Sequence, residues 1–235
     1  MGFVRKDEVT KVYFWNDRLN WGDLLSVTIL NHFGIQHTWA KPEDAECVIV
    51  GSILEHLPHG WTGTVIGAGK LREHSEIRIR LRNANVLAVR GPLTAKHLKG
   101  DVAIGDPGLL ASLLVTPRQA AYDLGVIPHF SDYELVDRFP YGHFISPRNG
   151  GLWVLNEISK CRRIVSSSLH GCIAADSMAI PRQAELFDGS DFKWRDYSRS
   201  IGMKNPEFGK LVLANQNKVE RQQKEIQDAL ASYAS

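Results

Sequence analysis

One pattern recurs along this chain and limits its fold: a short apolar run, a turn with Gly or Ser, and a helix-like stretch. It occurs at 47–52, where Cys-Val-Ile-Val precedes Gly-Ser, at 86–91, and again at 163–168, where Arg-Ile-Val precedes three serines. Short buried strands that alternate with helices are typical of parallel βαβ units, whose sheets are covered by helices on both faces. The pattern therefore predicts an α/β protein.

The alternation of predicted strands and helices is interrupted by a Thr-Pro-Arg segment near 116–120 and resumes after it. We therefore expect two Rossmann-like lobes, residues 1–117 and 118–205, with a cleft between them. Residues 206–235 are predicted to form a helical tail, because their polar and apolar residues alternate at helical spacing.

Composition excludes several classes of protein. Hydrophobic residues make up 43% of the 235 residues, and 28 basic residues against 26 acidic ones give a net charge of +2. These values are typical of a globular domain and lack the concentrated basic excess of a nucleic-acid-binding protein. No apolar run reaches the roughly 18–20 residues of a membrane span. The first fifteen residues lack the apolar region of a secretory signal, so we expect a cytoplasmic location.

Neither a metal nor a cofactor is expected. The three cysteines, Cys47, Cys161 and Cys172, are too few and too scattered for a disulfide framework or a zinc site. The segment at 67–72, Gly-Ala-Gly-Lys-Leu-Arg, has only two of the three glycines of a dinucleotide-binding motif.

Candidate ligand-binding residues follow from the predicted sheets. Ligands of open α/β sheets bind outside the carboxyl ends of the strands, so polar residues directly after strands should line the cleft. This rule selects Asn20, Asp23, Ser52, Gly69, Arg90, Asp106, His129, Ser166, Ser167, Ser168 and His170.

The segment 163–181 is the most informative of these. Three serines, 166–168, end a strand and open a helix, an arrangement that favours an anion because free N–H groups and the helix dipole point toward it. His170 lies in the first turn, where the helix N-terminus should lower its pKa and suit it to proton exchange. The alternative is that the serines are ordinary helix caps and His170 is a structural polar residue.

Arg90 and Asp23 also have two interpretations each. Arg90 lies between a strand and a helix that begins with Pro92, where its guanidinium could grip a carboxylate or phosphate. It could equally be an ordinary surface arginine. Asp23 could bind substrate or cap the helix that follows it.

An ordered series of segments resembles the polysaccharide pyruvyl transferase family, the ketal-forming enzymes of bacterial exopolysaccharide synthesis. The series is NWGD (20–23), GSIL (51–54), GAG (67–69), AVRGPLT (88–94), GDPGLL (105–110), IPHF (127–130), IVSSSLHGCIAA (164–175) and FKWRDY (192–197).

The resemblance implies two Rossmann-like lobes in a glycosyltransferase-B arrangement and transfer of pyruvate from phosphoenolpyruvate to a sugar. The product would be a cyclic ketal, commonly across the 4- and 6-hydroxyls of a terminal hexose on a lipid-linked oligosaccharide. It implies catalytic roles for His170 and Arg90. Relatives often carry an arginine where this chain has Ser168, and Lys193 or Arg195 could take its place as the group that binds the donor carboxylate.

Two other functions stay open. One is a sugar-nucleotide-dependent glycosyltransferase of the same fold, and the other is a non-catalytic partner in exopolysaccharide assembly. A lipid-linked acceptor would also bring the protein to the inner face of the cell membrane. We expect the basic run at 78–82 to form a solvated face, and the alternative is that it contacts anionic headgroups there.

Overall fold

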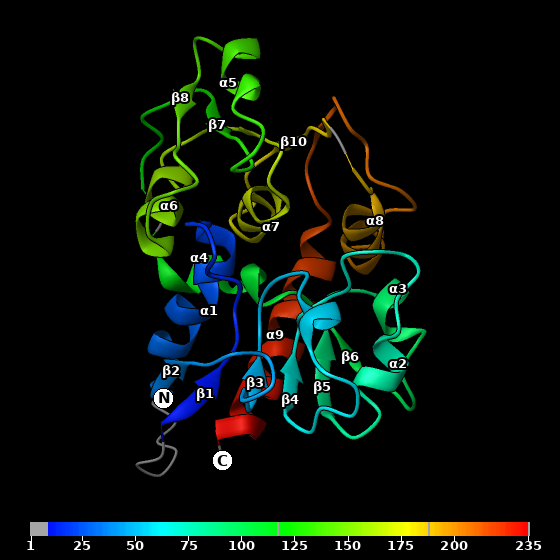
Figure 1. Cartoon of the computed structure of the whole chain (residues 1–235). Helices are drawn as coiled ribbons and strands as arrows, with labels where there is room; N and C mark the ends of the chain where they lie inside the picture. Colours follow the sequence, from blue (N-terminus) through cyan, green and yellow to red (C-terminus); the bar gives the residue numbers. More distant parts are fainter. Residues whose placement is uncertain (1–8, 117, 188, 235) are drawn as a thin grey trace.

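The structure is a computed structural model, and it describes residues 9–116, 118–187 and 189–234. The lobe boundary expected at residue 117, and residues 1–8 of the N-terminal segment considered above, lie outside the described residues. The chain forms two sheets with helices around them, as the alternation of strands and helices predicted (Figure 1).

The N-terminal sheet is parallel throughout and has the order β2-β1-β3-β4-β5-β6. Buried Val, Ile and Cys residues in the central strands account for it, since parallel strands are covered on both faces. Its strands are β1 (Thr10–Val12), β2 (His37–Trp39), β3 (Cys47–Val48), β4 (Thr64–Ile66), β5 (Asn85–Val89) and β6 (Ala103–Ile104).

The C-terminal sheet has the order β11-β10-β9-β7-β8, with only β11 antiparallel to its neighbour. Its strands are β7 (Gly125–Ile127), β8 (His143–Phe144), β9 (Ile164–Ser166), β10 (Arg182–Ala184) and β11 (Leu211–Val212).

The helices that position the pocket described below are α1 (Trp21–His32), α7 (Leu169–Ser177) and α8 (Phe192–Ser200). Short α- and 3-10 helices of about one turn lie in many of the connections between strands. They are η1 (Leu54–His56), α2 (Ile77–Arg80), α3 (Pro92–Ala95), η2 (Pro107–Leu110), α4 (Ala111–Leu114) and α5 (Glu134–Arg138). The longer α6 (Gly151–Ile158) packs against α1.

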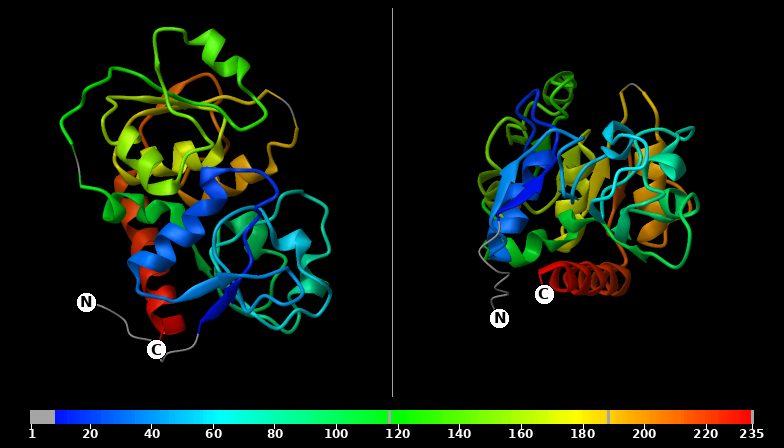
Figure 2. Two further views of the ribbon diagram at one scale, coloured as in Figure 1. Left: turned by 60° about the vertical axis from the view of Figure 1, so that its left-hand side comes forward. Right: turned by 60° about the horizontal axis from the view of Figure 1, so that its bottom comes forward.

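The C-terminal helix α9 (Gln216–Ala234) returns to the N-terminal sheet, where it packs against β4, β5 and β6 (Figure 2). Its apolar stripe is buried, with Ile226 and Leu230 both 0% exposed. One large apolar cluster contains residues of α1, α6, α7 and α9 together with strands of both sheets. The two sheets therefore share a core.

Both sheets share one topology. In each, the second strand lies outside the first and the later strands continue on the other side, which is the flavodoxin-like order 2-1-3-4-5. Strand order reverses between β1 and β3 in one sheet and between β7 and β9 in the other. Ligands of such sheets bind outside the carboxyl ends of the strands at these reversals. The described residues contain no helix long and apolar enough to cross a membrane.

Candidate functional site

A pocket of about 300 Å³ lies where the two strand-order reversals face each other. The loops after β1 and β3 form one wall, and the loop after β7, the first turn of α7 and the start of α8 form the other. Its lining residues are Trp15, Asn20, Asp23, Ser52, Ile53, His56, Leu71, His129, Phe130, Ser168, Leu169, His170 and Lys193.

The strand-end rule placed six of its candidates, and the resemblance a seventh, in this pocket: Asn20, Asp23, Ser52, His129, Ser168, His170 and Lys193. The other candidates lie behind the lining, and their contacts are described below.

The start of α1 presents a buried carboxyl group to the pocket. Asn20 caps the helix through its Oδ1, which accepts from the N–H of Gly22, and its Nδ2 donates to Asp23 Oδ2 at 2.6 Å. Burial raises the pKa of Asp23 to about 7, although the Asn20 hydrogen bond and Lys193 act in the opposite direction. Asp23 therefore titrates near neutral pH, whereas an exposed helix-capping aspartate would be fully ionised there.

Two of the three serines at the end of β9, Ser166 and Ser167, hold the loops rather than face the pocket. The Ser166 hydroxyl, 0% exposed, donates to the carbonyl oxygens of Ile127 and Ser168, and Ser167 Oγ accepts from the N–H of His129 at 2.8 Å. Only Ser168, the residue before α7, lines the pocket. The helix start still faces the pocket, because Ser168, Leu169 and His170 all belong to the lining.

The His170 ring is packed between the starts of α1 and η2. A Cβ built on Gly22 would collide with Nδ1, and one built on Gly108 would lie 3.6 Å from Cδ2. On the inner side, Nε2 lies 3.9 Å from Oδ2 of Asp106, and neither buried atom has a hydrogen-bond partner among the described residues. Asp106 does not line the pocket and instead supports this ring from behind.

The electrostatics of this pair follow from burial. Burial lowers the pKa of His170 to about 3, with further lowering by Arg90, Lys193 and His129. Burial also raises the pKa of Asp106 to about 6. The pKa of His170 is lowered, as the sequence suggested, but burial rather than the helix N-terminus is the main cause. His170 is therefore a neutral imidazole at pH 7.

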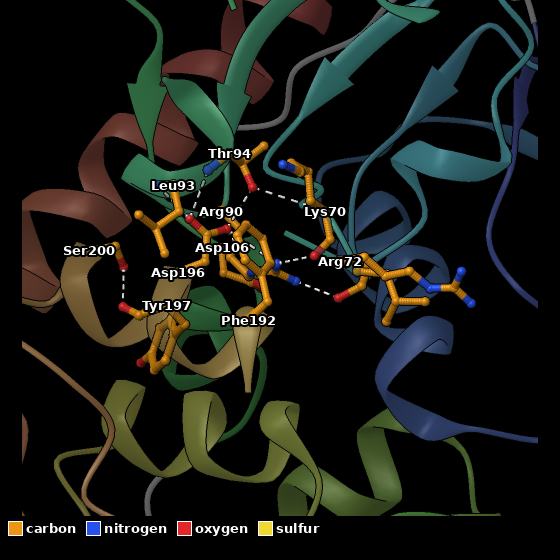
Figure 3. A network of polar contacts seen from close by, with 12 residues as sticks. Lys70, Arg72, Arg90, Leu93, Thr94, Asp106, Phe192, Asp196, Tyr197 and Ser200 are labelled. Atoms are coloured by element: carbon orange, nitrogen blue, oxygen red, sulfur yellow. Dashed lines mark hydrogen bonds and ion pairs between the residues drawn. The ribbon is translucent and has the colours of Figure 1, made fainter. Parts of the chain in front are cut away.

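Arg90 lies beneath the pocket and is 1% exposed (Figure 3). Its guanidinium donates to Asp196 Oδ2 at 3.2 Å, to Ser52 Oγ at 2.5 Å and to the Lys70 carbonyl oxygen at 2.5 Å. Gly69 lets the guanidinium lie against the backbone, since a Cβ there would collide with it. Arg90 is therefore not a surface arginine, and it reaches the pocket through Ser52.

Asp196 of α8 completes this network. It accepts hydrogen bonds from the N–H groups of Leu93 and Thr94 and from the Thr94 hydroxyl, besides its ion pair with Arg90. The pair joins the end of β5 to α8 and thereby links the two parts of the chain.

Lys193 and Arg195, both in α8, differ in their ion-pair partners. Arg195 pairs with Glu73 at 2.8 Å and Asp191 at 3.0 Å, so its charge is already balanced. Lys193 lines the pocket and has no ion-pair partner among the described residues. Burial lowers its pKa, and Arg90 adds to the effect.

An aromatic wall made of Trp15 and Phe130 was not predicted from the sequence. The two rings, from the loops after β1 and β7, stack with centroids 5.4 Å apart and planes 24° apart. His129 packs on Phe130, and burial lowers the pKa of His129 to about 4. His56, also missed as a pocket residue, accepts or donates a 2.6 Å hydrogen bond with the Tyr13 hydroxyl. The sequence signal that could have predicted the aromatic wall is that Trp15 and Phe130 each follow shortly after the end of a strand.

The residues that the structure describes include no group of three His, Cys, Asp or Glu that could hold a metal ion. The arrangement is a polar pocket with one unpaired ammonium group, a helix start, a protonatable carboxyl group and an aromatic wall. It defines an α/β protein with a polar pocket between two sheets whose strands are parallel except for β11.

Two known proteins resemble the chain. It is 27% identical over 212 residues to the succinoglycan biosynthesis protein ExoV of Rhizobium meliloti (strain 1021), which covers 82% of this chain and 65% of that protein. It is 28% identical over 176 residues to the uncharacterized protein L143 of Acanthamoeba polyphaga mimivirus, which covers 65% of this chain and 60% of that protein. The chain thus spans less than two thirds of the length of either relative. No protein-family model matches the chain.

Proposed function

We propose that this chain is a transferase that moves pyruvate from phosphoenolpyruvate to two hydroxyls of a terminal sugar, forming a cyclic ketal in exopolysaccharide synthesis. Similarity to a succinoglycan biosynthesis protein supports the polysaccharide context. The same proposal includes a glycosyltransferase-B-like arrangement of two lobes around the pocket.

The observation that carries the proposal is Lys193 beside the first turn of α7. The Lys193 ammonium group forms no direct ion pair among the described residues, although Asp23 and Asp132 act on its pKa, and it lines the same pocket as a helix N-terminus. Both favour an anion, and phosphoenolpyruvate offers two, a carboxylate and a phosphate. We assign the donor carboxylate to Lys193, because Arg195 already has two acidic partners.

His170 keeps a catalytic role in this proposal. Burial is the main cause of the low His170 pKa, and nearby positive groups lower it further. A bound phosphate and carboxylate would offset those positive groups, so the pKa would rise on donor binding. The imidazole can then accept a proton from an attacking sugar hydroxyl. Arg90 acts as a positioning residue that fixes Ser52 at the pocket wall.

The acceptor is a sugar that carries two free hydroxyls. The Trp15–Phe130 wall offers apolar ring faces on which the C–H groups of a sugar can pack. A lipid-linked oligosaccharide as acceptor, contact with the membrane surface and a cytoplasmic location stay predictions.

The test is a turnover experiment. The protein is incubated with phosphoenolpyruvate and methyl hexopyranosides whose 4- and 6-hydroxyls are free, and phosphorus and proton NMR follow phosphate release and the new ketal methyl signal. We expect both signals to grow together without added metal. Turnover with a UDP-hexose and none with phosphoenolpyruvate would contradict the proposal in favour of a glycosyltransferase.

A further inference from the structure

Titratable side chains from several elements line the pocket. Asp23 comes from α1, His170 from α7, Lys193 from α8, His56 from η1 and His129 from the loop after β7. Burial holds the pKa of His170 at about 3 and that of His129 at about 4, so both are neutral at pH 7.

Asp23 is the exception among these groups. Its side chain is buried, with the residue 7% exposed, and burial raises its pKa to about 7. Lys193 lowers that pKa, and Tyr13, behind the pocket wall, has its own pKa raised partly by the Asp23 charge. An acid whose pKa lies near the working pH is the most effective proton donor.

The hydrogen bonds of Asp23 fix which oxygen carries the proton. Asn20 Nδ2 donates to Oδ2, and such a donor favours the unprotonated oxygen. Among the described residues, Oδ1 accepts no hydrogen bond. A Cβ built on Gly51 would lie 2.7 Å from Oδ1, so glycine at 51 leaves room for this oxygen and its proton.

We infer that Asp23 is the acid that protonates the methylene carbon of the donor, a catalytic role that rests on the proposed function. Asn20 holds the carboxyl group in place, and Lys193 holds the donor in the same pocket.

The step balances as follows. The C2–C3 π pair of phosphoenolpyruvate takes the Asp23 proton, so C3 becomes a methyl group and C2 an oxocarbenium centre. The first sugar hydroxyl adds to C2, and its proton returns to Asp23. The C2–O bond to phosphate then breaks and the second hydroxyl adds to C2. His170 accepts the proton of this hydroxyl and passes it to the departing phosphate, which leaves as hydrogen phosphate. Donor plus diol gives ketal plus phosphate, with no oxidant or metal consumed.

The test compares wild type with Asp23→Asn, Asp23→Glu and the matched control Asp17→Asn, an exposed residue of the loop before α1. Phosphate release from phosphoenolpyruvate with a methyl hexopyranoside is measured from pH 5.5 to 9, and donor binding by calorimetry. We expect wild-type kcat to fall above pH 7. Asp23→Asn should bind phosphoenolpyruvate but lose about 10²–10⁴-fold in kcat. Asp23→Glu should recover part of the loss, and Asp17→Asn should match wild type.

Two results would overturn the assignment while leaving the proposed function intact. One is an Asp23→Asn protein with more than about a tenth of wild-type kcat, since loss of a general acid lowers the rate far more. The other is a wild-type kcat that stays flat from pH 6 to 9, which decides the matter even where the Asn variant does not fold. A wild-type protein that neither binds phosphoenolpyruvate nor releases phosphate would contradict the proposed function itself.

Discussion

The Arg90–Asp196 pair offers the sharpest test of how the chain holds its pocket. Both side chains are buried, at 1% and 0% exposed, and Asp196 accepts from Leu93 and Thr94 as well. Asp196→Asn keeps the shape of the side chain but removes the only acidic partner of Arg90 among the described residues. Breaking a buried ion pair in this way costs about 3–5 kcal/mol, because a buried charge is left uncompensated.

That loss should be visible as a lower melting temperature. For a chain of this size, each kcal/mol shifts Tm by about 2–4 °C, so Asp196→Asn should lower Tm by roughly 6–20 °C. The matched control is Asp191→Asn, at the start of the same helix, where the ion pair with Arg195 is 44% exposed on the Asp side. Exposed pairs contribute about 0–1 kcal/mol, so the control should stay within a few degrees of wild type.

The assay is thermal unfolding followed by circular dichroism at constant pH. A double variant, Arg90→Met with Asp196→Leu, separates the charge from the packing and should be less destabilised than Asp196→Asn alone. If Asp196→Asn melted within the range of Asp191→Asn, the buried pair would not be what joins β5 to α8, and our account of Arg90 would be wrong.

Four further outcomes are expected. Lys193→Met should raise KM for phosphoenolpyruvate at least about tenfold in steady-state assays, because its charge binds the donor; an unchanged KM would remove Lys193 from the donor site. Gly22→Ala should push His170 aside and lower kcat about 100-fold while the protein still folds, as checked by circular dichroism; normal kcat would show that the ring position is not critical. Phosphoenolpyruvate binding should take up protons near pH 6, seen as a buffer-dependent heat in calorimetry, since the bound anion raises the pKa of His170; equal heats in all buffers would contradict this. Asp23→Asn should be more stable than wild type at pH 8, by up to about 4 kcal/mol, because the folded pKa of about 7 exceeds the unfolded value of 3.8. In unfolding curves this gain in stability should vanish below about pH 4. A loss of stability at pH 8 would refute the raised pKa.

The sign of the last effect follows from linkage. A carboxyl group with a raised folded-state pKa binds its proton more tightly in the folded state. Asp23 therefore opposes folding least below its unfolded pKa of 3.8, and most once the pH has risen past about 7. Asparagine, which never ionises, removes that penalty.

Local sequence was enough to predict the central strands of both sheets and the loops that bear the pocket. The apolar runs within 47–52, 86–91 and 163–168 form β3, β5 and β9. The tail predicted to be helical over 206–235 instead begins with a short strand, β11, and its helix α9 starts only at Gln216. The rule that ligands bind after strand ends then selected Asn20, Ser52 and His129, all of which line the pocket. Each of these follows from short-range apolar patterning and strand direction.

Other features depend on contacts between distant residues, which one sequence does not reveal. Arg90 looked like a free guanidinium because its partner, Asp196, lies 106 residues further along the chain. The helix α8 was not predicted because its buried residues include a charged one, Asp196, beside Trp194 and Tyr197. The stacking of Trp15 on Phe130 likewise requires that β1 and β7 face each other.

The central claim is that the pocket is built for phosphoenolpyruvate, and ligand-dependent melting in the presence of EDTA tests it most directly. At about 100 times its Kd, phosphoenolpyruvate should add roughly 2.7 kcal/mol of stability, which raises Tm by about 5–11 °C. UDP-glucose should leave Tm unchanged, and Lys193→Met should lose most of the phosphoenolpyruvate shift. A shift with UDP-glucose and none with phosphoenolpyruvate would contradict the account.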